Sequence, residues 1–125
     1  MNHVLVLYLP YPPSFNHYWR NWRGHTVISA QGRAYRQFAI LEVKRQWKGQ
    51  AWPCPVEVCY TVTRPDRRRR DIGNLEKVLS DVLTAAGVWK DDCQVQRNTQ
   101  EWATVPANAP GVLVTITETR ERPYR

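Results

Sequence analysis

The sequence predicts a single small domain of the α/β class (α+β), with a mixed four-stranded sheet and two main helices in the order β-α-β-α-β-β. Three observations support this prediction. The chain has 125 residues, which suits one domain. Its 42% hydrophobic content can form a core, and stretches with helical periodicity alternate with strand-like ones. We expect the domain to span residues 1–117, followed by a mobile, charged tail over residues 118–125.

Four stretches have the composition and alternation of strands. Val4–Leu9 is a run of β-formers that prolines end, and Val56–Thr63 places its apolar side chains on one side. Val95–Val105 is predicted as an irregular strand, and residues 108–111 have the composition of a turn. Together with Val112–Thr117, this pattern predicts a C-terminal hairpin.

Two stretches predict helices. The first is expected from about Ala30 to Lys48, with Ser29 as its N-cap, after a short extended piece at residues 24–28. The second is expected to begin at Asp71, where a carboxylate satisfies free backbone N–H groups, and to end at Gly87. Its apolar face recurs at helical spacing: Ile72, Leu75, Val78, Leu79, Val82, Leu83 and Ala86.

The charge balance favours a polyanionic partner. The formal net charge is +7 and the sequence pI is about 9.7, which predicts salt-sensitive attraction to nucleic acid. We expect no membrane association, because no apolar run approaches the ~20 residues needed to span a bilayer. No signal peptide is evident, and three cysteines without zinc spacing indicate reduced thiols, so we expect a cytoplasmic protein.

The stretch from residue 64 to residue 92 concentrates the residues that chemistry on DNA requires. Four arginines precede the second helix: Arg67, Arg68, Arg69 and Arg70. The helix begins with Asp71, carries Asn74, Lys77 and Asp81 on one stripe, and is followed by Asp91 and Asp92. Carboxylates can hold Mg²⁺ beside a phosphate, and a lysine can stabilise the charge that develops there. The pattern therefore indicates a phosphodiester-cutting metal site.

Each of these features also has a common structural explanation. A run of arginines is usually a solvated surface, an aspartate before a helix is usually a cap, and adjacent aspartates are often turn residues. The combination in one short stretch favours the functional interpretation.

The segment from Ser14 to Arg23 alternates aromatic and cationic residues. Such mixtures stack on bases or hold a nucleic-acid backbone, but its aromatic residues are about as well explained as the edge of the core. Arg33, near the start of the first helix, opposes the helix dipole, which suggests that it faces a phosphate.

The string PDRRRRDIGNLEKVLSDVLTAAGVWKDDCQV, with PYPPSFNHYWR and SAQGRAY nearer the N-terminus, resembles the RusA family of Holliday-junction resolvases, which prophages often carry. The resemblance covers most of the chain. It implies a homodimeric, Mg²⁺-dependent endodeoxyribonuclease that acts on four-way DNA junctions in recombination and repair. The roles it implies are catalysis by Asp71, Lys77 and Asp92, metal binding by Asp71, Asp92 and Asp91, and DNA binding by Arg67, Arg68, Arg69, Arg70, Arg20, Arg23, Arg33, Asn16 and Tyr18.

One position departs from the family pattern. Gly73 stands where the family has the second acid of its D-x-D motif, so we expect weakened metal binding and weak or absent turnover. The main alternative is therefore a catalytically impaired protein that binds junction DNA. A further alternative is a basic nucleic-acid-binding module whose acids are purely structural.

Overall fold

A computed structural model describes residues 3–104 and 109–119 and confirms the predicted fold class. The end of the predicted strand at Val105, residue 108 of the predicted turn and residues 120–125 of the predicted tail lie outside the described part. The elements, in chain order, are β1 (Val4–Leu9), α1 (Phe15–Tyr18), β2 (Trp19–Trp22), β3 (His25–Ile28), α2 (Ala30–Gln46), β4 (Val56–Thr63), α3 (Gly73–Ala85), the 3-10 turn η1 (Asp92–Gln94), β5 (Val95–Trp102) and β6 (Gly111–Glu118).

The main sheet has the strand order β1-β6-β4-β5. Strands β4 and β5 run parallel, while β6 pairs antiparallel with both β1 and β4. The predicted C-terminal hairpin is therefore wrong, because β6 does not pair with β5. The apolar side of β6, with Val112, Val114 and Ile116 fully buried, gains more from a central position than from the edge.

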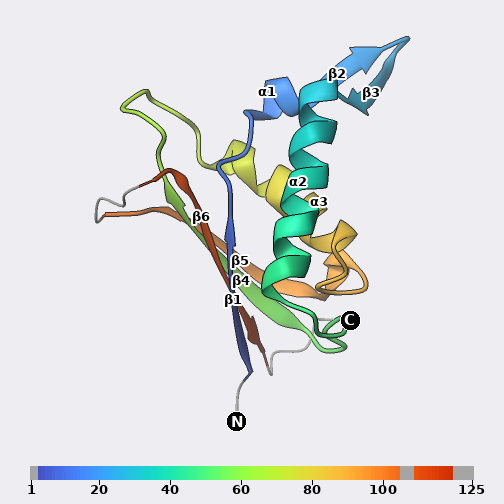
Figure 1. Cartoon of the computed structure of the whole chain (residues 1–125), viewed down its shortest axis with the longest axis vertical. Helices are drawn as coiled ribbons and strands as arrows, with labels where there is room; N and C mark the ends of the chain where they lie inside the picture. The colour runs from blue at the N-terminus through green and yellow to red at the C-terminus, as the bar shows by residue number, and fades with distance from the viewer. Residues whose placement is uncertain (1–2, 105–108, 120–125) are drawn as a thin grey trace.

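Both main helices cover the same face of this sheet (Figure 1). On β4, Val56, Tyr60 and Val62 are fully buried and Val58 nearly so, as their alternation predicts. The apolar face predicted for α3 is buried against them, with Ile72 only partly covered. The opposite face of the sheet is open and exposes Val4, Val6, Tyr8 and Leu113.

Helix α2 begins where the sequence predicts. The Ser29 hydroxyl accepts a hydrogen bond from Gly32 N at 2.9 Å and caps the helix. The helix ends at Gln46 rather than Lys48, since Trp47 has an extended backbone. The Gln46 side-chain amide bonds both the N–H and the carbonyl of Tyr8, each at 2.7 Å. It thereby ties the end of α2 to the edge strand β1.

The segment after β1 forms α1 and β2, which the periodicity does not predict, and β3, which corresponds to the extended piece predicted at residues 24–28. Helix α1 is a single turn, and β2 and β3 form an antiparallel hairpin that projects from the body (Figure 1). Elements of four residues are too short to show a helical or strand period.

A three-residue network fastens this segment to both helices. The Tyr18 hydroxyl donates to Asp81 Oδ2 at 2.7 Å, and Arg36 Nε lies 3.0 Å from the same oxygen. Burial of Tyr18, together with its hydrogen bond to Asp81, raises the pKa of the phenol above its ordinary value. The base of the hairpin is therefore held to α3 by Asp81, with Arg36 of α2 completing the contact.

All three cysteines are free thiols. Cys59 is half-buried, because it lies on the side of β4 opposite the core. Among the described residues, no helix combines the length and the apolar character needed to cross a bilayer.

Replacement of Tyr18 by Phe should destabilise the fold, because Asp81 loses a hydrogen-bond donor while Arg36 still faces it. Hydrogen bonds to charged groups contribute about 1.5–3 kcal/mol, so we expect the free energy of unfolding to fall by about that amount in urea titrations. The matched control is Tyr8→Phe on the open face of the sheet, which should change stability by less than about 0.5 kcal/mol. Equal urea midpoints for the two variants would contradict the prediction.

Candidate functional site

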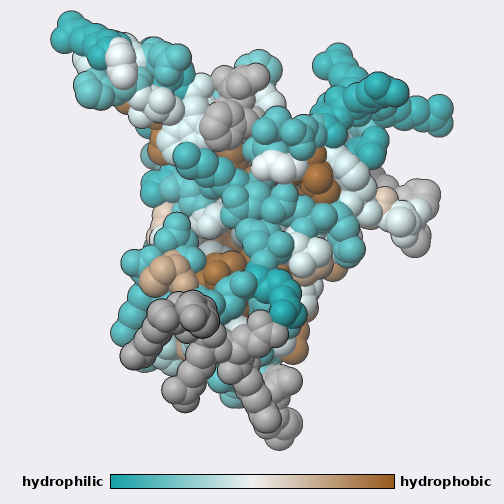
Figure 2. Space-filling view, turned by 180° about the vertical axis from the view of Figure 1, so that it is seen from behind, coloured by the Kyte–Doolittle hydropathy of each residue, from teal (hydrophilic) through white to brown (hydrophobic). Residues whose placement is uncertain are grey.

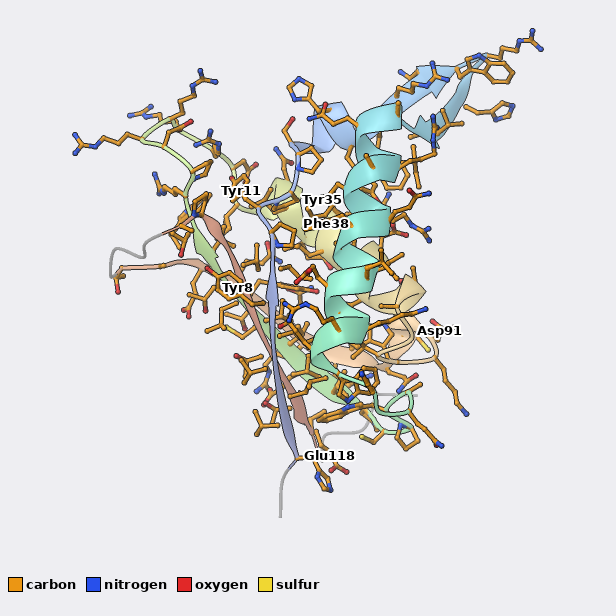
Figure 3. The ribbon with its side chains drawn as sticks, viewed as in Figure 1. Tyr8, Tyr11, Tyr35, Phe38, Asp91 and Glu118 are labelled. Carbon is orange, nitrogen blue, oxygen red and sulfur yellow. The ribbon has the colours of Figure 1, made fainter. Side chains whose placement is uncertain are left out.

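The two acidic positions that the sequence singles out lie at opposite ends of α3. The helix has 13 residues, which span about 20 Å at 1.5 Å per residue. Asp71 follows the end of β4, whereas Asp92 leads into β5, whose first residue pairs with the first residue of β4. Figure 3 shows Asp91, which directly precedes Asp92 in the chain, on the other side of α2 from Tyr11. Asp71 and Asp92 accordingly line different cavities; their meeting around one ion stays a prediction.

Asp71 lies just before α3 and caps it from outside. Its Oδ1 accepts a hydrogen bond from Gly73 N at 3.0 Å, so the helix begins at Gly73, two residues later than predicted. The side chain is exposed and lines a cavity of about 350 Å³ with Arg64, Arg69 and Arg70. Asp71 therefore has both features that the sequence predicts: a capping hydrogen bond and arginine-rich surroundings.

Gly73 lies between Asp71 and Lys77, and a larger side chain would fit at this position. A Cβ added there would lie 3.3 Å from Asp71 Oδ1, close to the flexible end of one side chain. Residue 73 also lies one helical turn before Lys77, on the same face of α3. A carboxylate at position 73 would thus stand between Asp71 and Lys77.

Lys77 and Asp92 line a common cavity of about 250 Å³, with Glu76 at its side and Trp19 contributing an aromatic wall. Both Lys77 and Asp92 are exposed to solvent. Lys77 Nζ lies 5.6 Å from the centre of the Trp19 ring, where the ring face attracts a cation. This cavity combines a carboxylate with an ammonium group, which are the two charges that the sequence predicts for phosphodiester chemistry.

The turn before β5 fixes the position of Asp92. Asp91 is the N-cap of η1, and its carboxylate accepts from Cys93 N at 2.9 Å. The Gln94 side chain donates to Trp52 O at 2.6 Å and to Cys54 O at 2.9 Å, which anchors the turn. The hydrogen bond from the Cys93 backbone lowers the pKa of Asp91. Asp91 therefore has the structural role that the turn explanation predicts, and its role as a metal ligand stays a prediction.

Glu76 also lines this cavity, although no pattern in the sequence singles it out. Its Oε1 accepts from Asn98 Nδ2 at 2.8 Å, and Gln100 Nε2 in turn donates to Asn98 Oδ1 at 2.8 Å. Asn98 and Gln100 lie on β5. In the sequence, only the position of Glu76 next to Lys77 could indicate that it lines this cavity. The contact of Glu76 with β5 could not be predicted, because it depends on the parallel pairing of β4 and β5. Asp81, by contrast, points to Tyr18 and Arg36.

The carboxylates fit a metal ion only in part. Over residues 3–104 and 109–119, no group of three or more His, Cys, Asp or Glu side chains is arranged to hold a metal ion. The physical causes are the missing acid at position 73, the capping role of Asp91 and the length of α3. Mg²⁺ commonly uses only one or two carboxylates and takes its other ligands from water and phosphate. The cavity of Asp92 and Glu76 fits that open arrangement, but not a closed one.

The four arginines before α3 do not act alike. Asp66 accepts two hydrogen bonds from the Arg70 guanidinium and one from Arg68 N at 2.8 Å, which folds the loop. These bonds, above all those from Arg70, hold the pKa of Asp66 far below its usual range. Arg67, Arg68 and Arg69 remain exposed. We call residues 64–70 the arginine loop.

The other predicted DNA-binding residues lie near the β2–β3 hairpin. Arg20 and Arg23 are exposed on it, and Arg33 of α2 donates to Ile28 O at 2.9 Å. Figure 2 shows the hairpin and the arginine loop as two hydrophilic arms at opposite corners of the molecule. Tyr18 does not face DNA: its side chain is fully buried against Asp81. The side chain of Asn16 lies outside the described part.

Comparison with known proteins identifies the family. Residues 10–117 match the family model described as endodeoxyribonuclease RusA. The chain is 47% identical over 87 residues to the crossover junction endodeoxyribonuclease RusA of Shigella sonnei, a match that covers 70% of this chain and 72% of the relative. Identity and coverage are the same for the enzyme of enterobacteria phage 82, and the Escherichia coli K12 enzyme is 46% identical over the same shares. Because the family model covers most of the chain and these relatives share almost half of its residues over more than two thirds of its length, the chain belongs to the RusA endodeoxyribonuclease family.

Proposed function

We propose that the protein is a Mg²⁺-dependent endonuclease that cuts four-way DNA junctions in recombination and repair in the cytoplasm. The observation that carries the proposal is the cavity that Lys77, Asp92 and Glu76 line together. The family relationship supports the reaction class, since the relatives are named crossover junction endodeoxyribonucleases. The net charge of +7 supports a DNA partner.

The chain's own residues supply most of the chemistry. Asp92 and Glu76 would hold the Mg²⁺, and Lys77 reaches the phosphate from the same cavity. When bound, the metal lowers the pKa of a water and polarises the phosphoryl oxygens. Lys77 compensates the negative charge that develops on those oxygens during in-line attack. The bond from phosphorus to the 3′ oxygen breaks and that oxygen takes a proton, which leaves a 5′-phosphate and a 3′-hydroxyl.

We also propose that the protein acts as a homodimer. A four-way junction has two-fold symmetry, so two copies related by a two-fold axis can cut opposed strands. The apolar side chains exposed on the open face of the sheet, Val4, Val6, Tyr8 and Leu113, offer surface for such a contact.

The second candidate function is junction binding with little cleavage. The observation that favours it is Gly73, which supplies no carboxylate at the position between Asp71 and Lys77. The two candidates share a DNA surface and differ in turnover.

Gly73→Asp separates them. The new carboxylate would stand between Asp71 and Lys77, so the restored variant should cut a synthetic four-way junction faster and at lower Mg²⁺ concentration. Gly73→Asn is the matched control, because it adds similar volume without the charge. If the natural sequence already cuts as fast as the restored variant, the binding-only candidate is excluded. If neither variant cuts, the nuclease proposal fails.

Lys77→Ala should reduce cleavage and largely preserve binding, since the ammonium group acts on charge that develops in the transition state. Loss of one such electrostatic contact costs about 100- to 1000-fold in kcat. Single-turnover cleavage and a parallel binding titration would measure the two effects. Lys44→Ala, on an exposed position near the end of α2, is the control and should change neither. A binding loss as large as the cleavage loss would refute the assigned role of Lys77.

Arg68→Ala should weaken binding in a salt-dependent way, because Arg68 is exposed on the arginine loop. Each lost duplex phosphate contact reduces the slope of log affinity against log salt by about 0.9. Binding measured between low and moderate salt would give that slope. Arg45→Ala is the control, since Arg45 pairs with Glu42 on α2. An unchanged slope for Arg68→Ala would exclude a phosphate contact.

A further inference from the structure

The tip of the β2–β3 hairpin has a defined conformation. The strands pair from Trp19 with Ile28 to Trp22 with His25, which leaves a two-residue turn. Both turn residues have positive φ, 49° for Arg23 and 77° for Gly24. Such two-residue turns match the natural twist of paired strands and hold a hairpin in one register. The backbone at the tip therefore has a defined register, which sets where the side chains of Trp22 and Arg23 begin.

An exposed aromatic residue and a cation lie together at this tip. Trp22 is 47% exposed, and the Arg23 guanidinium carbon lies 4.5 Å from the centre of its ring. An arginine over an indole face is a cation–π contact. The pair offers a flat apolar surface next to a positive charge, which is the combination that stacks on nucleobases and attracts their phosphates.

The charge around the hairpin favours a polyanion over another protein surface. The first acidic residue of the whole chain is Glu42, so the hairpin and its flanks contain only neutral and basic residues. Arg20 and Arg23 are exposed on the hairpin itself. A partner protein of mixed charge would find no acid on the hairpin itself with which to pair, whereas a nucleic acid finds the exposed Arg20 and Arg23.

The hairpin is also mechanically connected to the candidate site. At its base, Tyr18 bonds Asp81 of α3, and Trp19 lines the cavity of Lys77 and Asp92. Its tip therefore stands at a fixed offset from that cavity, and the arginine loop projects on the other side (Figure 1). A DNA substrate held by both arms would place its centre between them.

We propose that Trp22, with Arg23, stacks on a nucleobase that has lost a neighbour at the branch point of a DNA junction. Base pairs at a branch point have an incomplete stack, so an indole can replace the missing neighbour, whereas continuous duplex offers no such base. This proposal rests on the proposed DNA function and adds to it a residue that distinguishes branched from linear DNA.

The test uses the full-length protein in EDTA, so that binding is measured without cleavage. The substrates are a four-way junction and a linear duplex of the same length. The junction carries 2-aminopurine at its branch point, and the duplex carries it in the middle. Trp22→Ala should weaken junction binding about 5- to 150-fold, the range for loss of one base stack, and should leave duplex binding unchanged. Trp22→Phe should restore most of the affinity and the change in 2-aminopurine fluorescence at the branch point.

The matched control is Phe38→Ala, which removes an aromatic side chain that is 54% exposed on α2; it should affect neither substrate. The proposal is overturned if Trp22→Ala binds the junction normally, if it loses junction and duplex affinity equally, or if it changes the sedimentation of the free protein instead. A natural protein that binds the junction no better than the duplex refutes the junction function itself, which is a separate outcome.

Discussion

The packing of α3 onto β4 is the constraint on which the rest of the structure depends. Leu79, Val82 and Leu83 are fully buried against the apolar side of β4. Because α3 connects two parallel strands, it must cross the sheet from the end of β4 to the start of β5. Everything attached to its two ends is placed by that crossing: the arginine loop and Asp71 at one end, and the turn with Asp92 at the other.

This geometry explains how the acids are used. Asp71 caps the helix, Asp91 caps the next turn and Asp81 holds the hairpin, so three of the carboxylates near the site already have structural partners. Asp92 and Glu76 remain beside Lys77 in one cavity. An acid at position 73 would join the two regions, because it would contact Asp71 and precede Lys77 by one turn. Gly73 therefore has two effects: it removes one negative charge, and it leaves a gap between Asp71 and the cavity of Lys77.

The basic residues are arranged by the same principle. Asp66 pairs with Arg70 and Asp81 pairs with Arg36, and each pair fixes a segment of backbone. Exposed arginines project on two arms, the loop with Arg67, Arg68 and Arg69 and the hairpin with Arg20 and Arg23. Two separated cationic arms suit a branched polyanion, whose phosphates diverge from a centre. The acidic cavity lies against the base of one of these arms.

The sequence alone determined the features that depend on local periodicity and composition. The bounds of β1 and β4, the cap of α2 at Ser29, the buried face of α3 and its end at Gly87 all follow from neighbours within a few residues. The motifs around Arg67, Lys77 and Asp92 likewise indicated the family before any coordinates. Only the tertiary structure decided the central place of β6, the separation of Asp71 from Asp92, the burial of Tyr18 and the contact of Glu76 with Asn98. Each of these depends on which strands pair and on how far one helix reaches, and such long-range choices leave no trace in local spacing.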